Sequence, residues 1–154
     1  MFDNAEDRLH RLFAVAVFFF SGFRRKLKIV IEIAPREPID RLSILEIKLA
    51  RIKDEAKLKN IRHEHELTTR KRQKLSPTGT ELECLAAELK TVNEKIWQIE
   101  DDIRDHERNR SFGDSFVALA RSVYQTNDKR AELKRRINEL LNSTLVEEKS
   151  YTPY

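Results

Sequence analysis

The sequence contains very few of the residues that build disulfides, metal clusters and tight turns. Cys84 is the only cysteine among 154 residues, so an intrachain disulfide, a cysteine-rich metal site and a redox pair are all excluded. Three glycines and four prolines are too few for the many turns of a β-sandwich or barrel, and no glycine-rich phosphate loop is present. With 36% charged residues, the composition favours a mainly α-helical protein in a reducing, cytoplasmic setting.

The sequence also lacks an excess of one charge beyond its first 28 residues. Residues 1–28 hold six Lys or Arg and three Asp or Glu, whereas the remainder holds 24 basic and 23 acidic residues. Such a balance is typical of helices covered in ion pairs and argues against a phosphate-binding surface. The basic cluster from Arg70 to Lys74 is interpreted as a solvated helix end. We therefore do not expect nucleic acid as a partner.

No apolar run is long enough to span a bilayer, which takes about 20 residues. The longest, Leu12–Phe20, precedes the basic stretch Arg24-Arg25-Lys26, and the acidic residues before it do not fit a secretory signal. Two alternatives remain for this segment. Residues 12–26 either form an interfacial anchor that makes the protein membrane-peripheral, or belong to a poorly ordered extension that docks its phenylalanines on the helices. In both, residues 1–27 are an extension and residues 28–154 a single helical domain.

The first part of this domain reads as a short strand followed by two helices. Residues 27–33, L-K-I-V-I-E-I, form an isolated strand candidate that must pair with a second subunit or lie extended across helices. Pro38 suits the first turn of a helix over residues 38–53 with one apolar face. Asp54 is a suitable N-cap for a weaker helix that reaches about residue 74.

Two long amphipathic helices follow, over about residues 80–109 and 114–142. Thr80 and Glu83 predict a capping box at the start of the first helix. Both helices repeat apolar residues at alternating steps of three and four, which are Leu82, Leu85, Leu89, Val92, Ile96, Ile99, Ile103 and, in the second helix, Phe116, Leu119, Val123, Leu133, Ile137 and Leu140. We predict an antiparallel hairpin of these helices, packed with one or two further helices, because a single apolar seam facing water would not fold.

Polar residues interrupt the seam of the second long helix. Thr126 and Arg130 take seam positions, with Asn127 beside them. Arginine is always charged, so an acidic group must lie close to Arg130. Antiparallel packing places residue 130 opposite about residue 94, which makes Glu94 and Glu100 the candidate partners.

Two interpretations of this polar region remain open. In the structural one, an Arg130–carboxylate pair fixes the register of the helices, with Glu46 of the first helix as a further candidate partner. In the functional one, polar residues of the two long helices line an anion-accepting cavity, namely Asn93, Asn127, Arg130 and Lys134.

Other fragments that suggest a site have simpler explanations. His63-Glu64-His65-Glu66 places its histidines two residues apart, on different sides of a helix, so we expect no metal site. His106 is interpreted as a helix-end histidine and Trp97 as core packing. We predict no catalytic residue and no cofactor.

Four separated blocks carry a family resemblance. They are IDRLSILEIKLARIKD at 39–54, VNEKIWQIEDDIR at 92–104, YQTNDKRAELKRRIN at 124–138 and VEEKSY at 146–151. In this order they resemble a bacterial family of unknown function, and the match covers about residues 28–151. The resemblance implies a small bacterial protein, encoded in some genomes near glycosyltransferase and surface-polysaccharide genes. It implies no active site.

Two functional classes follow, and we favour the first. It is a non-enzymatic helical interaction or scaffold protein, with a protein partner or self-association as a homodimer, which we expect to serve surface-polysaccharide assembly. The second is a small helical enzyme or anion-binding protein with its site inside the bundle. The surroundings of Arg130 distinguish them, because a closed ion pair fits the first class and a cleft with unpaired cations fits the second.

Overall fold

The computed structural model describes residues 30–75, 79–150 and 152. The chain divides into two compact units, Met1–Glu32 and Ile33–Tyr154. In the first unit the described residues 30–32 are exposed and form no strand. Residues 27–29 of the strand candidate, and the predicted extension over residues 1–27, lie outside the described residues.

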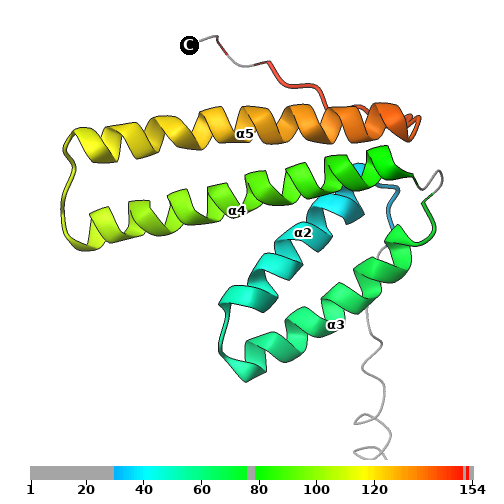
Figure 1. Ribbon diagram of the computed structural model, residues 1–154, viewed down its shortest axis with the longest axis horizontal. Coiled ribbons are helices and arrows are strands. Elements are labelled where there is room, and N and C mark those ends of the chain that lie inside the picture. Colours follow the sequence, from blue (N-terminus) through cyan, green and yellow to red (C-terminus); the bar gives the residue numbers. More distant parts are fainter. Residues whose placement is uncertain (1–29, 76–78, 151, 153–154) are drawn as a thin grey trace, which may run out of the picture. The chain divides into compact units, whose positions relative to one another are not determined.

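The second unit is helical, as the sequence predicts. Its described residues form α2 (Arg36–Arg51), α3 (Glu55–Arg72), α4 (Thr80–Arg108) and α5 (Asp114–Leu140) (Figure 1). Each helix begins and ends within two residues of its predicted bounds. Asp54 caps α3 as predicted, because its side chain accepts hydrogen bonds from the backbone amides of Ala56 and Lys57 at 2.9 and 3.2 Å. Among the described residues, no helix combines the length and hydrophobicity needed to cross a membrane.

The start of α4 differs from the prediction. Gly79 is the N-cap and offers no side chain, whereas Thr80 already lies inside the helix, so the predicted capping box is wrong. The carboxylate of Glu83 turns instead to α3, where both of its oxygens accept from Arg72 Nη2 at 2.7 Å. A contact between neighbouring helices has replaced the local cap.

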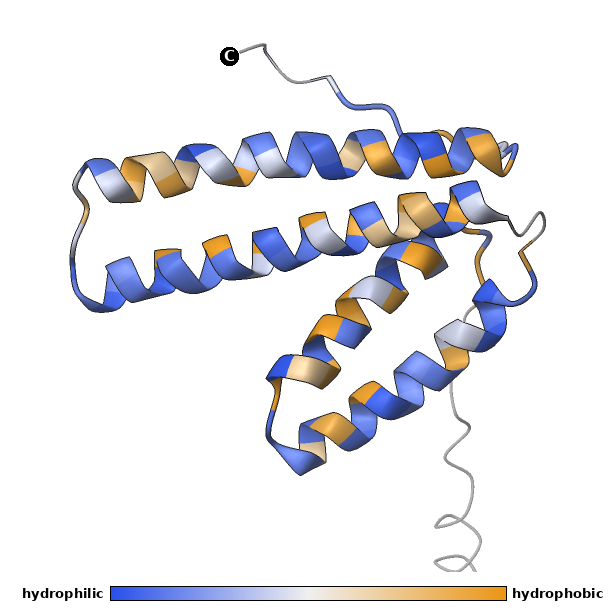
Figure 2. Cartoon of the chain, viewed as in Figure 1, coloured by the Kyte–Doolittle hydropathy of each residue, from blue (hydrophilic) through white to orange (hydrophobic). Residues whose placement is uncertain are grey.

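The packing of these helices centres on α4 and α5, which run antiparallel along their lengths (Figure 1). Helix α2 contacts both of them and also packs against α3. Hydrophobic residues recur along α4 and α5 between polar ones, as the seam pattern requires (Figure 2). The main core lies where α2 meets the hairpin and comprises Ile39, Leu82, Leu85, Leu89, Val92, Leu133, Ile137 and Leu141. A smaller core between α2 and α3 comprises Leu45, Leu58 and Ile61.

The hairpin has two differently packed halves. We call residues 80–95 and 126–140 the base, and residues 96–125 the arm. The base contains the main core, whereas Ile99 is the only buried residue of the arm and its other seam residues are half-exposed. In Figure 1 the arm extends beyond α2 and α3. A third helix therefore covers the base, and its last residue reaches only the start of the arm, where Arg51 donates to Gln98 Oε1 at 3.3 Å.

Candidate functional site

Arg130 of α5 lies in the base, beside the start of α2. Its Nη2 donates to Asp40 Oδ2 at 2.6 Å and its Nε donates to Asp40 Oδ1 at 3.3 Å, which is a forked guanidinium–carboxylate pair. Asp40 is only 4% exposed. Asn93 Nδ2 of α4 donates to the same Oδ1 at 2.9 Å. Asp40 thus links α4 to α5 and holds Asn93 and Arg130 at the same level, close to the predicted register.

Hydrogen bonds complete the surroundings of this pair. The second hydrogen of Asn93 Nδ2 is donated to Ser43 Oγ at 2.7 Å, and that hydroxyl donates to the backbone carbonyl of Asp40 at 2.8 Å. Across the described residues, every buried side-chain nitrogen or oxygen has a hydrogen-bond partner. The polar interior is therefore satisfied without a bound ligand.

Further charges extend the pair along α2 to the segment after α5. Lys134 Nζ lies 3.3 Å from Glu37 Oε1 and 3.6 Å from Asp40 Oδ2. Arg36 Nε donates to Glu37 Oε1 at 2.9 Å, and Arg36 Nη2 donates to Glu147 Oε2 at 2.7 Å. We call these residues the six-charge network. Its members are Arg36, Arg130 and Lys134 with Glu37, Asp40 and Glu147, so the formal charges cancel.

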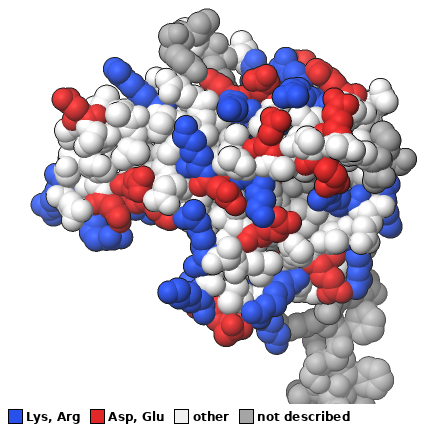
Figure 3. Space-filling view, viewed as in Figure 1, with Lys and Arg blue, Asp and Glu red and all other residues white. Residues whose placement is uncertain are grey.

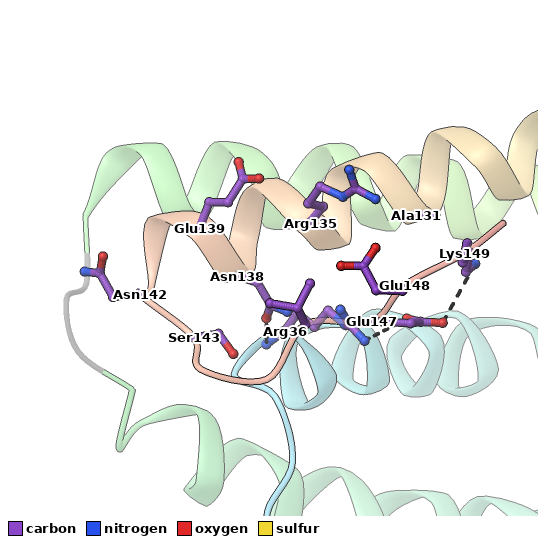
Figure 4. Close-up of a pocket in the computed structure, with 11 residues that line it drawn as sticks. Arg36, Ala131, Arg135, Asn138, Glu139, Asn142, Ser143, Glu147, Glu148 and Lys149 are labelled. Carbon is purple, nitrogen blue, oxygen red and sulfur yellow. Dashed lines mark hydrogen bonds and ion pairs between the residues drawn. The ribbon is translucent and has the colours of Figure 1, made fainter.

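The Arg36 end of the network borders a cavity of about 450 Å³, shown in Figure 4. The segment after α5 forms one wall, where Asn138 Nδ2 donates to the carbonyl of Leu145 at 3.2 Å. Asn138 Oδ1 also accepts the backbone amide of Arg36 at 3.3 Å. The lining carries three cations and three anions, Arg36, Arg135 and Lys149 with Glu139, Glu147 and Glu148. This cavity has no surplus of either charge.

A second cavity, of about 350 Å³, lies where α2 ends its contact with α4, and we call it the junction cavity. Trp97 and Arg130 are two of its walls, and the guanidinium of Arg51 lies 6.0 Å from the centroid of the Trp97 ring. Trp97 is therefore half-buried cavity lining rather than closed core packing. The full lining is Ile44, Ile47, Asn93, Ile96, Trp97, Glu100, Asp101, Arg104 and Arg130.

Three of the seven predicted site residues meet around Asp40, namely Asn93, Arg130 and Lys134. Asn127 does not join them, because its amide donates to the carbonyl of Val123 one turn earlier, at 3.0 Å.

None of the three acidic candidates pairs with Arg130, although Glu100 lines the junction cavity with Asn93 and Arg130. Glu46 binds Lys90 Nζ at 2.8 Å, Glu100 pairs with Arg104 at 3.0 Å, and Glu94 is exposed. The hydrogen bond to Glu46, with the negative charges of Glu46 and Glu94, raises the pKa of Lys90 against the opposing effect of burial.

Asp40 is the functional residue that the sequence pattern missed. Helical periodicity shows that α2 has a buried face, but not where that face crosses α5. A usable signal is the spacing of Asp40 and Ser43, two small polar residues one turn apart beside the apolar residues Ile39 and Leu42. Such residues at the edge of a buried stripe mark a polar contact with a neighbouring helix.

The structure describes three histidines, His63 and His65 of α3 and His106 of α4. No group of three or more His, Cys, Asp or Glu side chains is positioned to hold a metal ion in the part of the chain that the structure describes. His106 lies in the last turn of α4, with its Nδ1 2.8 Å from the carbonyl oxygen of Ser111. It is a helix-end histidine, as the sequence predicts.

Residues 29–154 match DUF6165, a family of unknown function. The chain belongs to this family. The match includes all four helices and the segment after α5, so the six-charge network lies entirely within the shared region, and residues 1–28 lie outside it. No curated protein and no solved structure matches the chain.

Proposed function

We propose that this DUF6165 protein is a non-enzymatic helical scaffold whose role is to bind other helices. The observation that carries the proposal is the pairing of charges in the six-charge network. An anion-binding or catalytic site needs polar groups that are held ready for a ligand or a developing charge. Here two nitrogens of Arg130 are engaged by Asp40, and the other two cations also contact carboxylates.

Such a network is suited to fixing how helices pack. A buried polar pair leaves an unpaired charge if the helices slide, so wrong registers are disfavoured even where the net stabilisation is small. Asp40, Asn93 and Arg130 come from three different helices and satisfy one another only in this arrangement. The network therefore supports a structural role for the base, whose function is to hold the arm in place.

The arm supplies a surface for a partner. Phe112 and Val117 are 51% and 43% exposed, and the apolar seam residues around them are half-exposed. Uncharged atoms predominate over the upper left of Figure 3, where Figure 1 places the first half of α5. Exposed apolar side chains beside an uncharged stretch of a helical hairpin are typical of helix-binding surfaces.

The biological setting is part of the same proposal. The blocks that resemble a bacterial family with polysaccharide-gene neighbours support a bacterial, cytoplasmic protein in surface-polysaccharide assembly. Residues 12–26 would bring it to the membrane surface. Flotation of the full chain with anionic vesicles, beside a chain that begins at Lys28, tests this attachment. Equal flotation of both forms contradicts it.

Ligand-dependent melting tests the scaffold against the enzymatic or anion-binding alternative. We expect inorganic phosphate, citrate and a nucleoside diphosphate sugar each to leave the melting temperature of the full chain unchanged, since Arg130 is already paired. The control is Arg130→Met, which removes the candidate anion contact. A ligand-induced rise that occurs in the parent and is absent from a folded Arg130→Met variant overturns the scaffold proposal.

A further inference from the structure

Charge is unevenly distributed over the helical domain, although its total is nearly balanced. Residues 48–74, from the end of α2 to just past α3, hold ten Lys or Arg and only four Asp or Glu. The other residues from 29 to 154 hold 14 basic and 19 acidic residues. Lys and Arg side chains predominate at the lower tip in Figure 3, where Figure 1 places the turn between α2 and α3. The region of α3 is therefore strongly basic, whereas the remainder of the domain is acidic.

Helix α3 leaves most of its surface to solvent. Among the described helices it packs closely against α2 alone, through a face that includes Leu58 and Ile61. On the opposite side, exposed residues recur at steps of four, four, three and four, which keep to one face of a helix. This stripe continues into the turn after α3, and we call it the outer face. Its residues are Lys59, His63, Leu67, Arg70 and Lys74.

The carboxylates of α3 do not neutralise its lysines, because each of them pairs with an arginine. These pairs are Glu55 with Arg62, Glu64 with Arg41 and Glu66 with Arg70. Five lysines on α3 and beside it are exposed, and none forms an ion pair with a residue that the structure describes. They are Lys53, Lys57, Lys59, Lys71 and Lys74. A surplus of positive charge therefore remains on this helix.

A cationic helix of this kind fits an anionic phospholipid surface. Clusters of four to eight Lys or Arg attract anionic headgroups, and each such residue contributes about a fivefold factor in affinity. Leu67, in the middle of the outer face, is 44% exposed and can contact the headgroup layer. A nucleic acid would meet the same charge, but the outer face has no Phe, Tyr or Trp on which bases stack. It would also leave the apolar run Leu12–Phe20 without a partner.

We infer that α3 lies against an anionic phospholipid bilayer through its outer face, with Lys59, Lys71 and Lys74 near the headgroup phosphates. The inference rests on the membrane attachment in the proposed function and adds a second contact to that of residues 12–26. Helix α3 has 18 residues and is about 27 Å long, so it presents an extended line of charge to the surface. Adsorption of this kind weakens as salt is added.

Flotation of the full chain with vesicles tests the outer face. The vesicles are phosphatidylcholine with about 30% phosphatidylglycerol, at about 0.15 M salt. We expect the triple variant Lys59→Glu/Lys71→Glu/Lys74→Glu to weaken binding at least about tenfold, because it replaces attraction by repulsion. Binding that survives this reversal overturns the inference, and so does a full chain that fails to float.

A matched control separates the outer face from the net charge of the protein. It reverses three exposed cations of α4 and α5, in the triple variant Lys95→Glu/Lys129→Glu/Arg135→Glu. The net charge changes equally, but charges more than a Debye length from the lipid are screened, so binding should weaken less than about threefold. Equal losses in the two triple variants overturn the inference, because binding would then follow net charge alone.

Two further measurements keep the test decisive. Circular dichroism melting shows whether the variants fold, and Lys59→Gln/Lys71→Gln/Lys74→Gln, which removes the same charges without reversing them, replaces a glutamate variant that does not. We expect this variant to weaken binding about fivefold or more. Equal flotation of the parent with pure phosphatidylcholine overturns the inference. A short DNA duplex that binds the parent more tightly than the vesicles, and loses affinity in the same α3 variant, also overturns it and assigns the face to nucleic acid.

The two proposals fail in different ways. Equal flotation of the full chain and a chain that begins at Lys28 contradicts attachment through residues 12–26, but the α3 contact stands if its lysines are still required. Flotation that needs residues 12–26 and is insensitive to the α3 lysines overturns the inference and leaves that attachment in place. A ligand-induced melting shift that depends on Arg130 overturns the scaffold whatever the vesicles show.

Discussion

The base and the arm are built from the same two helices and the same heptad pattern, yet they differ in what covers them. In the base, α2 lies across the hairpin, the seam is buried, and Asp40 connects three helices. In the arm the seam continues with Ile103, Phe116 and Leu119, but these residues stay half-exposed. A regular seam therefore specifies pairing of two helices, and only a third helix converts that pairing into a core.

The comparison implies that stability and binding are separated along one hairpin. The base holds the main buried core, so substitutions there act on the free energy of unfolding. The arm buries less within one chain, so its apolar residues remain available for association. The predictions below test this division, from the largest expected effect to the smallest.

Truncating one seam residue in each half tests most directly whether the base and the arm differ in stability. Leu89→Ala in the base is expected to lower the free energy of unfolding by about 3–4 kcal/mol, because Leu89 is 0% exposed and a cavity remains. Ile103→Ala in the arm should cost only about 1 kcal/mol, since solvent already reaches that side chain. Urea unfolding followed by circular dichroism measures both. Equal losses would show that the arm is as well covered as the base.

Breaking the ion pair between Arg130 and Asp40 is expected to have the next largest effect on the free energy of unfolding. Arg130→Met removes the forked partner of buried Asp40 and is expected to lower the free energy of unfolding by about 2–3 kcal/mol. This loss is smaller than for a fully buried pair, because the Arg130 side chain is 27% exposed. Adding Asp40→Asn should recover more than half of this loss, since the amide oxygen still accepts from Asn93. A double-mutant cycle by chemical denaturation measures the coupling. Additive losses would mean that the two residues do not act as a pair.

The segment after α5 should contribute less than the helices of the base. Glu147→Ala is expected to cost about 1 kcal/mol and to speed limited proteolysis after residue 140, because it removes the carboxylate that Arg36 Nη2 contacts at 2.7 Å. Glu148→Ala is the matched control, a neighbouring carboxylate that is exposed. If both variants behave alike, the Arg36 contact does not hold this segment.

The smallest expected effect concerns the pH dependence of the pair between Lys90 and Glu46. The pKa of Lys90 is raised in the folded protein, so its stabilising contribution is complete below the unfolded value of 10.5 and disappears as the pH rises through the folded value. The loss on Lys90→Met should therefore be constant between about pH 7 and 9 and shrink above pH 10. Urea denaturation of parent and variant across this range tests it. A difference in stability between parent and variant that grows with pH would contradict the raised pKa of Lys90.

The helices themselves were predictable from the sequence, because each is specified by its own residues. The heptad steps from Leu82 to Ile103 predicted the length of α4. Asp54 predicted the start of α3, because its side chain accepts hydrogen bonds from the backbone amides two and three residues later. The capping box at Thr80 failed for a tertiary reason, since Arg72 of the preceding helix binds Glu83.

The candidate site was only partly predictable. Arg130 at a seam position required a carboxylate nearby, and the turn predicted its level opposite about residue 94, one residue from the Asn93 that shares Asp40 with it. The identity of that carboxylate depends on where α2 crosses the hairpin, which no periodicity within α2 encodes. The contact of Arg36 with Glu147 was missed for the same reason, because Glu147 lies in an irregular segment whose path has no repeating pattern.

The contact between Arg36 and Glu147 also sets a time for the completion of folding. The two residues are 111 positions apart, so on a ribosome adding about 5–20 residues per second, Arg36 is made on the order of 10 s before its partner. During that interval Glu37 is the only one of the two carboxylate partners of Arg36 that has been synthesised, and until residue 134 is added no lysine shares it. The synthesis of residue 147 therefore completes the contacts of α2, and a nascent chain halted before that residue lacks the carboxylate that Arg36 Nη2 contacts at 2.7 Å.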